Sequence, residues 1–203
     1  MTTNVFDISI SPLKEDAIYP NDPPTVLTTL GEIWDLGYQL TCLQMSLHAG
    51  THIDFPAHFI RGGKQAGEYS LDTYFMTAQV TDGDQAFTAA AALQPGEALL
   101  VRTRQTGREN SLVFDLELAR VCTDKQLGLV GIDQLSIEES SDGSFPVHHT
   151  LLASGVLILE NLDLSKVENG KYQLICLPLK TEKTEAAPVR AVLLPLQEGW
   201  LLR

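Results

Sequence analysis

Apolar and polar positions alternate along two segments of this 203-residue chain. Residues 5–10 place an apolar side chain at every even position, and residues 39–47 alternate more loosely. Both patterns are typical of strands. The second pattern predicts a long strand that runs directly into the segment beginning at His48.

Short apolar runs predict further strands. They lie at 98–103, 127–132, 156–160, 172–177 and 189–194, and a polar loop joins the last two. Residues 114–124 have helix-forming composition with an apolar side, and residues 146–153 begin with proline, as short helices often do. Many strands with few helices between them predict one sheet-rich α/β domain over residues 1–203.

The segment 48–58 differs from an ordinary core strand. Its odd positions are almost all apolar, and its even positions read His48, Gly50, His52, Asp54, Pro56 and His58. Successive side chains of an extended chain point to opposite faces, so one face would carry three imidazoles and a carboxylate. Such a row of polar side chains is not expected in a hydrophobic core, whereas imidazoles and carboxylates are typical ligands of a divalent metal ion.

His52 and Asp54 can bind one ion together because residues two apart on a strand share a face. His48 lies about 13 Å from His52 along a fully extended chain. It can join them only if the chain bends near Gly50, and glycine tolerates the dihedral angles of such a bend. Three protein ligands with an open position are typical of a catalytic metal site.

His58 shares this face but follows Pro56, which lacks an N–H and should end regular strand pairing. The turn expected there would swing His58 away from the ion. We therefore interpret His58 as a general acid or base, since an unperturbed imidazole titrates near pH ~6.5. The alternative is that His58 is a further metal ligand.

Two more histidines, His148 and His149, follow a turn, and Glu160 ends the apolar run 156–160. Functional sites of α/β proteins often lie where buried strands end. An apolar run that ends in an acidic residue can also be a strand end that simply faces solvent. His148 and Glu160 could hold a second ion, with Asp54 bridging two ions about 3.5–4 Å apart. Adjacent side chains cannot easily point at one ion, so only one of His148 and His149 is expected to bind.

Composition narrows the expected partners. The net charge of −12 disfavours binding to nucleic acid or to a membrane surface. The first residues lack the basic and apolar regions of a signal peptide, and no apolar run could span a bilayer, so we expect a cytoplasmic protein. Three widely spaced cysteines, Cys42, Cys122 and Cys176, are expected to be small buried hydrophobic residues.

Other catalytic machinery is not indicated. The sequence contains no Gly-x-Ser-x-Gly motif, no P-loop and no Gly-x-Gly-x-x-Gly motif, so neither a serine hydrolase nor a nucleotide cofactor is expected. Glu138 and Glu139 are interpreted as solvated loop residues.

The string His-Ala-Gly-Thr-His-Ile-Asp-Phe-Pro-Ala-His at 48–58 resembles the H-x-G-T-H-x-D-x-P-x-H signature of the metal-dependent cyclase family. That family includes bacterial kynurenine formamidases, isatin-type hydrolases and polyketide cyclases. Shorter segments also have counterparts in the same order, whereas residues 22–34 have no clear match. The resemblance implies a sheet-rich α/β fold of the swivelling β/β/α type and a homodimer or higher homo-oligomer.

The resemblance also implies roles for the site residues. His48, His52 and Asp54 would bind one metal ion, and Asp54, His148 and Glu160 would bind a second. His148 is favoured over His149 by its interval to Glu160, and His58 corresponds to the family's catalytic histidine. Zinc is the expected metal, and manganese, iron or nickel would also suit imidazole and carboxylate ligands.

The resulting hypothesis is a metal-dependent amide hydrolase with a small-molecule substrate. The ion would lower the pKa of water from 15.7 towards about 7, and the water would attack a carbonyl carbon. His58 would pass a proton to the leaving amine. Family analogy favours N-formyl-L-kynurenine as the substrate. The alternatives are ring opening of a cyclic amide, polyketide-type cyclisation, or a non-catalytic protein with a structural metal.

Overall fold

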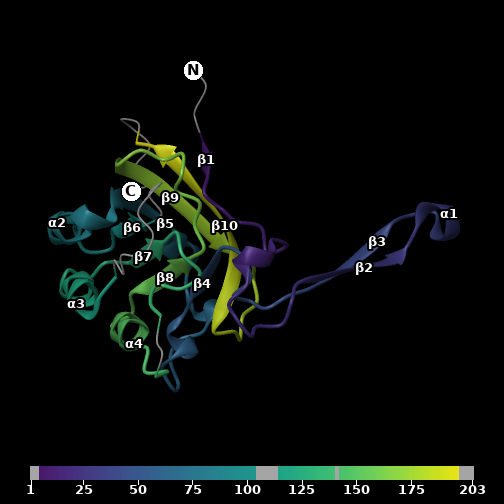
Figure 1. Cartoon of the computed structure of the whole chain (residues 1–203), viewed down its shortest axis with the longest axis horizontal. Helices are drawn as coiled ribbons and strands as arrows, with labels where there is room; N and C mark the ends of the chain where they lie inside the picture. The colour runs from purple at the N-terminus through teal and green to yellow at the C-terminus, as the bar shows by residue number, and fades with distance from the viewer. Residues whose placement is uncertain (1–4, 104–113, 140–141, 197–203) are drawn as a thin grey trace.

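A closed mixed sheet forms the body of the protein. A computed structural model describes residues 5–103, 114–139 and 142–196. Eight strands follow the order β1-β10-β4-β8-β7-β6-β5-β9, and an additional pairing of β9 with β10 closes the sheet (Figure 1). The strands are β1 (Phe6–Asp7), β4 (His52–Asp54), β5 (Phe75–Asp82), β6 (Ala98–Arg102), β7 (Leu129–Ile132), β8 (Leu157–Glu160), β9 (Gly170–Pro178) and β10 (Ala186–Pro195).

Three helices connect the parallel strands β5, β6, β7 and β8 in turn. They are α2 (Ala86–Ala92), α3 (Leu116–Asp124) and α4 (Pro146–Ala153), and Figure 1 shows all three on the same side of the sheet. Short 3₁₀ helices span Glu15–Ala17, Pro56–His58, Ala66–Glu68, Leu71–Tyr74 and Gly83–Gln85. The predicted sheet-rich α/β domain is confirmed.

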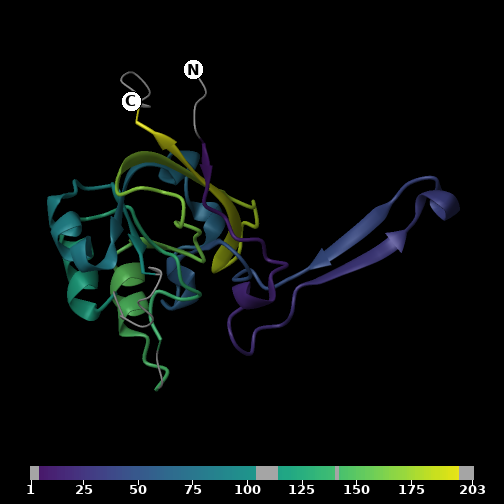
Figure 2. The same ribbon diagram turned by 45° about the horizontal axis from the view of Figure 1, so that its top comes forward.

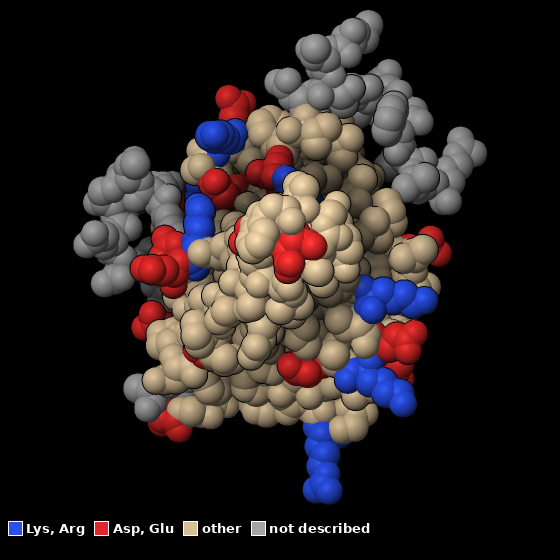
Figure 3. All heavy atoms as spheres, turned by 90° about the vertical axis from the view of Figure 1, so that its right-hand side faces the viewer, with Lys and Arg blue, Asp and Glu red and all other residues tan. Residues whose placement is uncertain are grey.

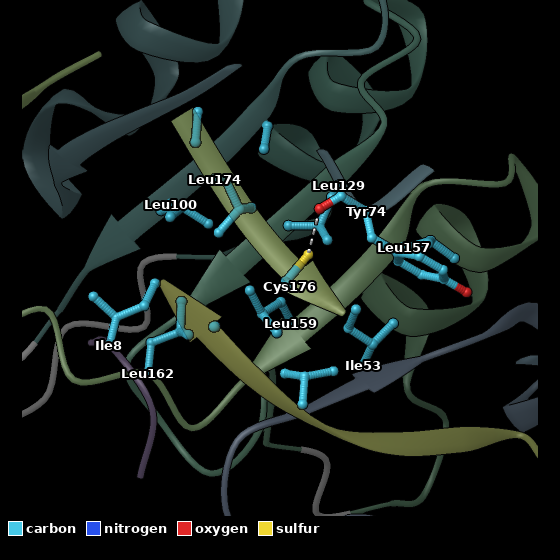
Figure 4. Packing of buried hydrophobic residues seen from close by; sticks show 14 of the residues in the cluster. Ile8, Ile53, Tyr74, Leu100, Leu129, Leu157, Leu159, Leu162, Leu174 and Cys176 are labelled. Atoms are coloured by element: carbon cyan, nitrogen blue, oxygen red, sulfur yellow. Dashed lines mark hydrogen bonds between the residues drawn. The ribbon is translucent and has the colours of Figure 1, made fainter. Parts of the chain in front are cut away.

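Alternate residues of the parallel strands face two separate hydrophobic clusters. Leu100 and Leu159 point into the cluster enclosed by the sheet, part of which is drawn in Figure 4. Leu99 and Ile158, one residue away on the same strands, join a second cluster that includes apolar residues of the helices. Both faces of β6, β7 and β8 are therefore buried, which explains their largely continuous apolar sequence.

Most predicted elements lie where the sequence placed them. The helix at 146–153 has the predicted bounds, and the apolar runs between 98 and 194 correspond to β6, β7, β8, β9 and β10. The predicted strand 5–10 is shorter, with β1 followed by an isolated bridge at Ser9. Residues 75–92, which hold β5 and α2, were not assigned, because α2 is mostly alanine and presents no apolar stripe.

The prediction of one long strand from 39 to 47 is wrong. β3 (Leu40–Gln44) ends before the histidine segment and pairs with β2 (Val26–Gly31) in a separate two-stranded sheet. Together with α1 (Ile33–Leu36) at its tip, this hairpin forms an arm, residues 26–44, that projects from the domain (Figures 1 and 2). The alternation in 39–47 therefore belongs to the arm.

The cysteine prediction is correct for two of the three residues. Cys122 and Cys176 are buried, and burial raises the pKa of each thiol to about 12. Cys42 is exposed because it lies on the arm. Among the described residues, no helix combines the length and apolar character needed to cross a membrane.

Candidate metal centre

Strand β4 brings two carboxylates and a histidine together. It lies between β8 and β10, and its register sets His52 beside Glu160 and Asp54 beside Ala186. His52 Nε2 is 3.4 Å from Glu160 Oε2 and 3.5 Å from Asp54 Oδ1. Two predicted ligands therefore come from one strand face and the third from the neighbouring strand.

The predicted bend at Gly50 is confirmed. Gly50 has a φ of 68°, and a Cβ there would lie 2.7 Å from the carbonyl oxygen of Ile10. Only glycine accommodates both conditions. The bend carries His48 back over the strand, so that its ring centroid lies 4.9 Å from that of His52 and its Nδ1 lies 3.1 Å from Asp54 Oδ1.

His58 stays closer to the cluster than the sequence predicted. The 3₁₀ turn at Pro56–His58 keeps His58 Nε2 within 3.9 Å of Asp54 Oδ2. Its ring also lies against that of His48, with centroids 4.4 Å apart. The turn at Pro56 does end β4, but it does not swing His58 out of reach of the carboxylate.

Helix α4 supplies the last predicted donor. His148 is buried, and its Nε2 lies 3.4 Å from Glu160 Oε1 and 4.0 Å from Asp54 Oδ2. His149, the next residue, is exposed and points elsewhere on the helix. The structure thus brings His148 to the cluster and leaves His149 outside it.

The prediction that Glu138 is a solvated loop residue is wrong. Its side chain is buried, with Oε1 2.8 Å from Nδ1 of His148. The same carboxylate accepts backbone N–H bonds from Val147 and His148, in the first turn of α4. Its acidic neighbour Glu139 is exposed as expected. No sequence signal separates the two, because only the loop path determines which one turns inward.

Glu185 was also missed. It precedes β10, and its Oε1 lies 3.5 Å from His48 Nε2. The sequence contains no signal of this role, because Glu185 lies in a polar loop and only the register of β10 with β4 brings it beside His48.

Buried atoms without partners suit a metal ion. His52 Nε2 and both carboxylate oxygens of Asp54 have no hydrogen-bond partner although they are buried. Such groups are costly in a folded protein unless a ligand satisfies them. The other nitrogen of His52 lies 2.9 Å from the carbonyl oxygen of Gly50, which can only accept, so Nδ1 carries a proton and Nε2 faces the carboxylates.

The carboxylates control the charge of the imidazoles. Burial alone would lower the pKa of His48, but Asp54 and the nearby glutamates raise it to about 9. Burial likewise opposes protonation of His148, yet Glu138, Glu160 and Asp54 raise its pKa to about 10. Although burial would raise the pKa of Asp54, the surrounding imidazoles lower it. When no ion is bound, protonated His48 and His148 therefore neutralise part of the negative charge of the buried carboxylates.

His58 differs from the other histidines of the cluster. Burial lowers its pKa below the usual value, and the cations of His48 and His148 oppose protonation further, which outweighs the attraction of Asp54. Its side chain is also the most accessible of the four, with 28% exposed. A neutral imidazole at the open side of the cluster can accept or deliver a proton near neutral pH.

The donor atoms fall into two groups that share Asp54. His48, Asp54 and His58 offer one set within 4.8 Å of one another, and His52, Asp54 and Glu160 offer the other. The sequence predicts a different grouping, with His48 beside His52 and His148 beside Glu160. The grouping differs because His48 comes from the turn before β4 and lies against His58, while Glu160 is the register partner of His52.

A cavity of about 230 Å³ opens onto these residues. Besides the histidines and Glu160, its lining includes Tyr19, Phe59, Phe145 and Leu135, and Asp22 adds a carboxylate. The rings of Phe59 and Phe145 lie 5.3 Å apart. The cavity therefore combines aromatic and aliphatic side chains with a cluster of imidazole and carboxylate groups.

Comparison with known proteins agrees with this description. The model of a family described as putative cyclase matches residues 6–139. Kynurenine formamidases of Bacillus thuringiensis (strain Al Hakam) and Bacillus anthracis are each 32% identical over 208 residues, covering 96% of this chain and 99% of theirs.

Solved structures show the same fold. A potential metal-dependent hydrolase with cyclase activity superposes with a TM-score of 0.79 at 28% identity, covering 97% of this chain and 100% of that one. A predicted metal-dependent hydrolase from Bacillus stearothermophilus gives 0.78 at 29% identity, with the same coverage. An isatin hydrolase, at 20% identity and a TM-score of 0.78, shares the fold. The fold is that of metal-dependent hydrolases. The chain belongs to the cyclase family.

Proposed function

We propose that this protein is a metal-dependent arylformamidase, which hydrolyses the amide bond between a formyl group and an aryl amine. The observation that carries the proposal is the setting of Asp54. This buried carboxylate lies within 4.0 Å of four histidines, beside an aromatic-lined cavity, and neither of its oxygens has a hydrogen-bond partner.

The residues proposed to hold the metal are His48, His52, Asp54, His148 and Glu160. Asp54 belongs to both donor groups, which favours two ions per chain with Asp54 shared between them. A bound divalent ion would polarise the substrate carbonyl and increase the acidity of water. We propose zinc as the native ion and manganese as the alternative, since nitrogen and oxygen donors suit both.

His58 is the proposed catalytic residue. Its lowered pKa leaves the imidazole neutral at pH 7, so it can take a proton from the attacking water. The same nitrogen can then deliver that proton to the nitrogen of the leaving amine. Asp54, 3.9 Å from His58 Nε2, stabilises the imidazolium that exists between these two transfers.

The rest of the cavity supports an aryl formamide. Phe59, Phe145 and Tyr19 offer apolar surface for an aromatic ring. Asp22 brings a carboxylate to the same cavity, where it can pair with a substrate ammonium group. N-formyl-L-kynurenine has an aryl formamide and an α-ammonium group, and we propose it as the substrate.

The direct test is an assay of purified protein, with zinc or manganese added after chelation, on N-formyl-L-kynurenine, formanilide and isatin. The proposal expects metal-dependent release of formate from the first two. Turnover of isatin alone would support ring opening of a cyclic amide, which releases no formate. Absence of metal-dependent turnover on all three substrates would contradict an amide hydrolase.

Asp22 gives a test of the substrate itself. Asp22→Asn should raise KM about tenfold for N-formyl-L-kynurenine and leave formanilide unaffected, because only the first substrate carries a cation. Asp16→Asn, at an exposed acid outside this cavity, is the matched control. Equal effects on both substrates would contradict the proposed ammonium contact.

The proposed location is the cytoplasm. All three cysteines are free, which suits a reducing compartment.

A further inference from the structure

Acidic side chains of this protein lie mostly at the surface, and Figure 3 shows several on the face from which the arm projects. Among the described residues, the buried acids are Asp54, Asp133, Glu138 and Glu160. Asp54 and Glu160 belong to the proposed metal centre, and Asp133 accepts hydrogen bonds from Thr103. Glu138 has no part in the chemistry proposed above. Burying a carboxylate is costly unless it is paired, so its partners indicate its role.

Helix α4 carries the proposed ligand His148 but has no cap of its own. The helix starts at Pro146, and the side chain of the preceding residue, Phe145, makes no capping hydrogen bond. The first backbone N–H groups of a helix have no acceptor within the helix and need one from outside it. Phenylalanine cannot supply that acceptor, unlike the serine, threonine, aspartate or asparagine usually found at this position.

Glu138 supplies the acceptor from the loop between β7 and α4. Its carboxylate oxygens accept the backbone N–H groups of Val147, at 3.0 Å, and of His148, at 2.7 Å. Oε1 also lies 2.8 Å from Nδ1 of the His148 ring. The side chain is only 5% exposed, so little water competes for these contacts. One carboxylate thus holds both the backbone and the ring of a single histidine.

The residue before Glu138 holds a second proposed ligand. The backbone N–H of Ile137 donates to Oε1 of Glu160, with the nitrogen and oxygen 2.7 Å apart. The other oxygen of Glu160 lies 3.4 Å from Nε2 of His52. Ile137 is itself buried in the second hydrophobic cluster, which fixes its backbone. Two consecutive residues therefore orient His148 and Glu160.

We infer that Glu138 is a positioning residue of the metal centre, which rests on the metal site proposed above. A carboxylate accepts hydrogen bonds, so the contact places a proton on Nδ1 of His148. Nε2 is then the nitrogen left to bind an ion, and it faces Glu160 at 3.4 Å and Asp54 at 4.0 Å. Loss of a carboxylate in this position typically weakens metal binding 10–100-fold.

The other two proposed histidine ligands are held differently. Nδ1 of His52 lies 2.9 Å from the backbone carbonyl of Gly50, which no side-chain substitution removes. Nε2 of His48 lies 3.5 Å from Glu185, whose side chain is 42% exposed. Water screens an exposed pair of this kind, so it contributes little. Of the three contacts, that of Glu138 is therefore the one that a substitution can remove with the largest effect.

Zinc titration of Glu138→Gln tests this role. The glutamine oxygen can still accept a backbone N–H, but the charge that holds the imidazole is gone. Zinc affinity, measured with a competing chromogenic chelator, should fall about 10–100-fold. Glu138→Asp, which keeps the charge on a shorter side chain, should lie between Glu138→Gln and wild type. Glu139→Gln, at the exposed neighbour, is the matched control and should bind zinc as wild type does.

A second control separates loss of a helix cap from loss of ligand position. Asp115 caps α3, since its side chain accepts the backbone N–H of Leu118 at 2.8 Å. Asp115→Ala should lower the unfolding midpoint and leave zinc affinity unchanged. If folded Glu138→Gln or Glu138→Asp binds zinc with wild-type affinity, Glu138 only caps α4 and the inference fails. Zinc binding by wild type with no formamide turnover would leave the inference standing and overturn the proposed function.

A second inference comes from the backbone of Phe145. Its φ of 43° and ψ of 54° are left-handed, a conformation that is unfavourable for a bulky residue. The next residue is Pro146, and a residue before proline prefers an extended backbone. Phenylalanine is also a poor N-cap. Three local preferences therefore oppose phenylalanine at this position, and such positions cluster at functional sites.

The ring of Phe145 lies where a substrate would bind. It lines the cavity, with its centroid 5.3 Å from that of Phe59 and 5.7 Å from that of His148. A substrate ring packed against these phenylalanines would lie beside a proposed metal ligand. We infer that Phe145 is a specificity-determining residue that selects aryl over alkyl formamides, which rests on the proposed function.

Phe145→Asn tests this selection. Asparagine tolerates the left-handed backbone and is a favoured N-cap, so the variant should remain folded. The ratio of kcat/KM for formanilide to that for N-methylformamide should fall about tenfold, because only formanilide has a ring to bury. Phe145→Gly, which also tolerates this backbone, should give the same result. Phe87→Asn, at an exposed phenylalanine of α2, is the matched control and should keep the wild-type ratio.

Binding of formanilide to chelated protein supplies a readout that needs no turnover. Saturation-transfer NMR should show binding about tenfold weaker in Phe145→Asn than in wild type. A wild-type ratio of kcat/KM, or wild-type binding of formanilide, in the folded variant overturns the inference. Binding that depends on Phe145, with no metal-dependent turnover of any formamide, would leave it standing and overturn the proposed function.

Discussion

Protonation of His48 and His148 is linked to metal binding, because the same imidazoles would bind either a proton or the ion. Carboxylates raise the pKa of these imidazoles from 6.5 to about 9 and about 10 in the metal-free protein. Their ion pairs therefore contribute full stability below pH 6.5, and this contribution is lost as pH rises through the two folded values. A metal ion needs neutral imidazoles, so it competes with these protons.

The first prediction concerns this competition. Zinc binding to chelated protein at about pH 7.5 should release one to two protons per chain, because His48 and His148 are protonated before binding. Calorimetry in buffers of different ionisation enthalpy measures the number. The gain in melting temperature on adding zinc should also grow from pH 6.5 to pH 9. Proton uptake on binding, or a gain that falls with pH, would contradict the assignment.

The second prediction separates the two roles of His58. Replacing His58 with glutamine should lower kcat by about 10²–10⁴-fold and leave the number of bound ions unchanged, which elemental analysis determines. His48→Gln should instead reduce the number of ions. If His58→Gln loses metal as His48→Gln does, His58 is a ligand, as its place in the first donor group allows.

Among the elements, the turn before β4 does more than the strand to assemble the site. Gly50 combines a positive φ with a close approach to the backbone of Ile10 and Pro12. Gly62 has a similar φ of 76°, with nothing within 4 Å of the position of an added Cβ. Comparing substitutions at Gly50 and Gly62 therefore separates two contributions to the free energy of unfolding. Both positions have a positive φ, but only Gly50 also lies close to neighbouring backbone atoms.

The third prediction uses this pair. Gly62→Ala should cost about 1 kcal/mol of unfolding free energy, from backbone strain alone. Gly50→Ala should cost about 2–4 kcal/mol, because the backbone must also move apart, and should weaken zinc binding because His48 is displaced. Urea unfolding and zinc titration measure the two effects. Equal costs at the two positions would show that the close approach is unimportant.

The elements also show what the sequence could and could not predict. The in-phase His and Asp positions identified the cluster, since their chemistry has no use in a core. Three parallel strands, β6, β7 and β8, are recognisable because burial on both faces leaves a largely unbroken apolar run, whereas the partly exposed β5 mixes polar and apolar residues. The arm was misread, because its alternation is the same as that of a strand in the domain. Glu138 was misread because burial of a loop residue depends on tertiary packing.

At the scale of the whole molecule, three parts of the chain meet at one site. The turn and strand 48–58 supply most donors, α4 and β8 supply His148 and Glu160, and the loop that precedes the arm adds Asp22. The closed sheet provides rigid support, because β4 is held between β8 and β10. Ser46, which follows the arm, joins two residues of the cavity, because it donates a hydrogen bond to Asp22 and accepts one from the backbone N–H of His48.

The central claim is that Asp54 holds catalytic metal, and a paired titration tests it most directly. Chelated wild-type protein should be inactive on an aryl formamide and should regain activity as zinc or manganese is added, reaching a plateau at one or two ions per chain. Asp54→Asn, nearly identical in shape, should stay folded by circular dichroism, bind neither ion with wild-type affinity and remain inactive. Full activity of the chelated protein, or wild-type metal binding by Asp54→Asn, would contradict the account.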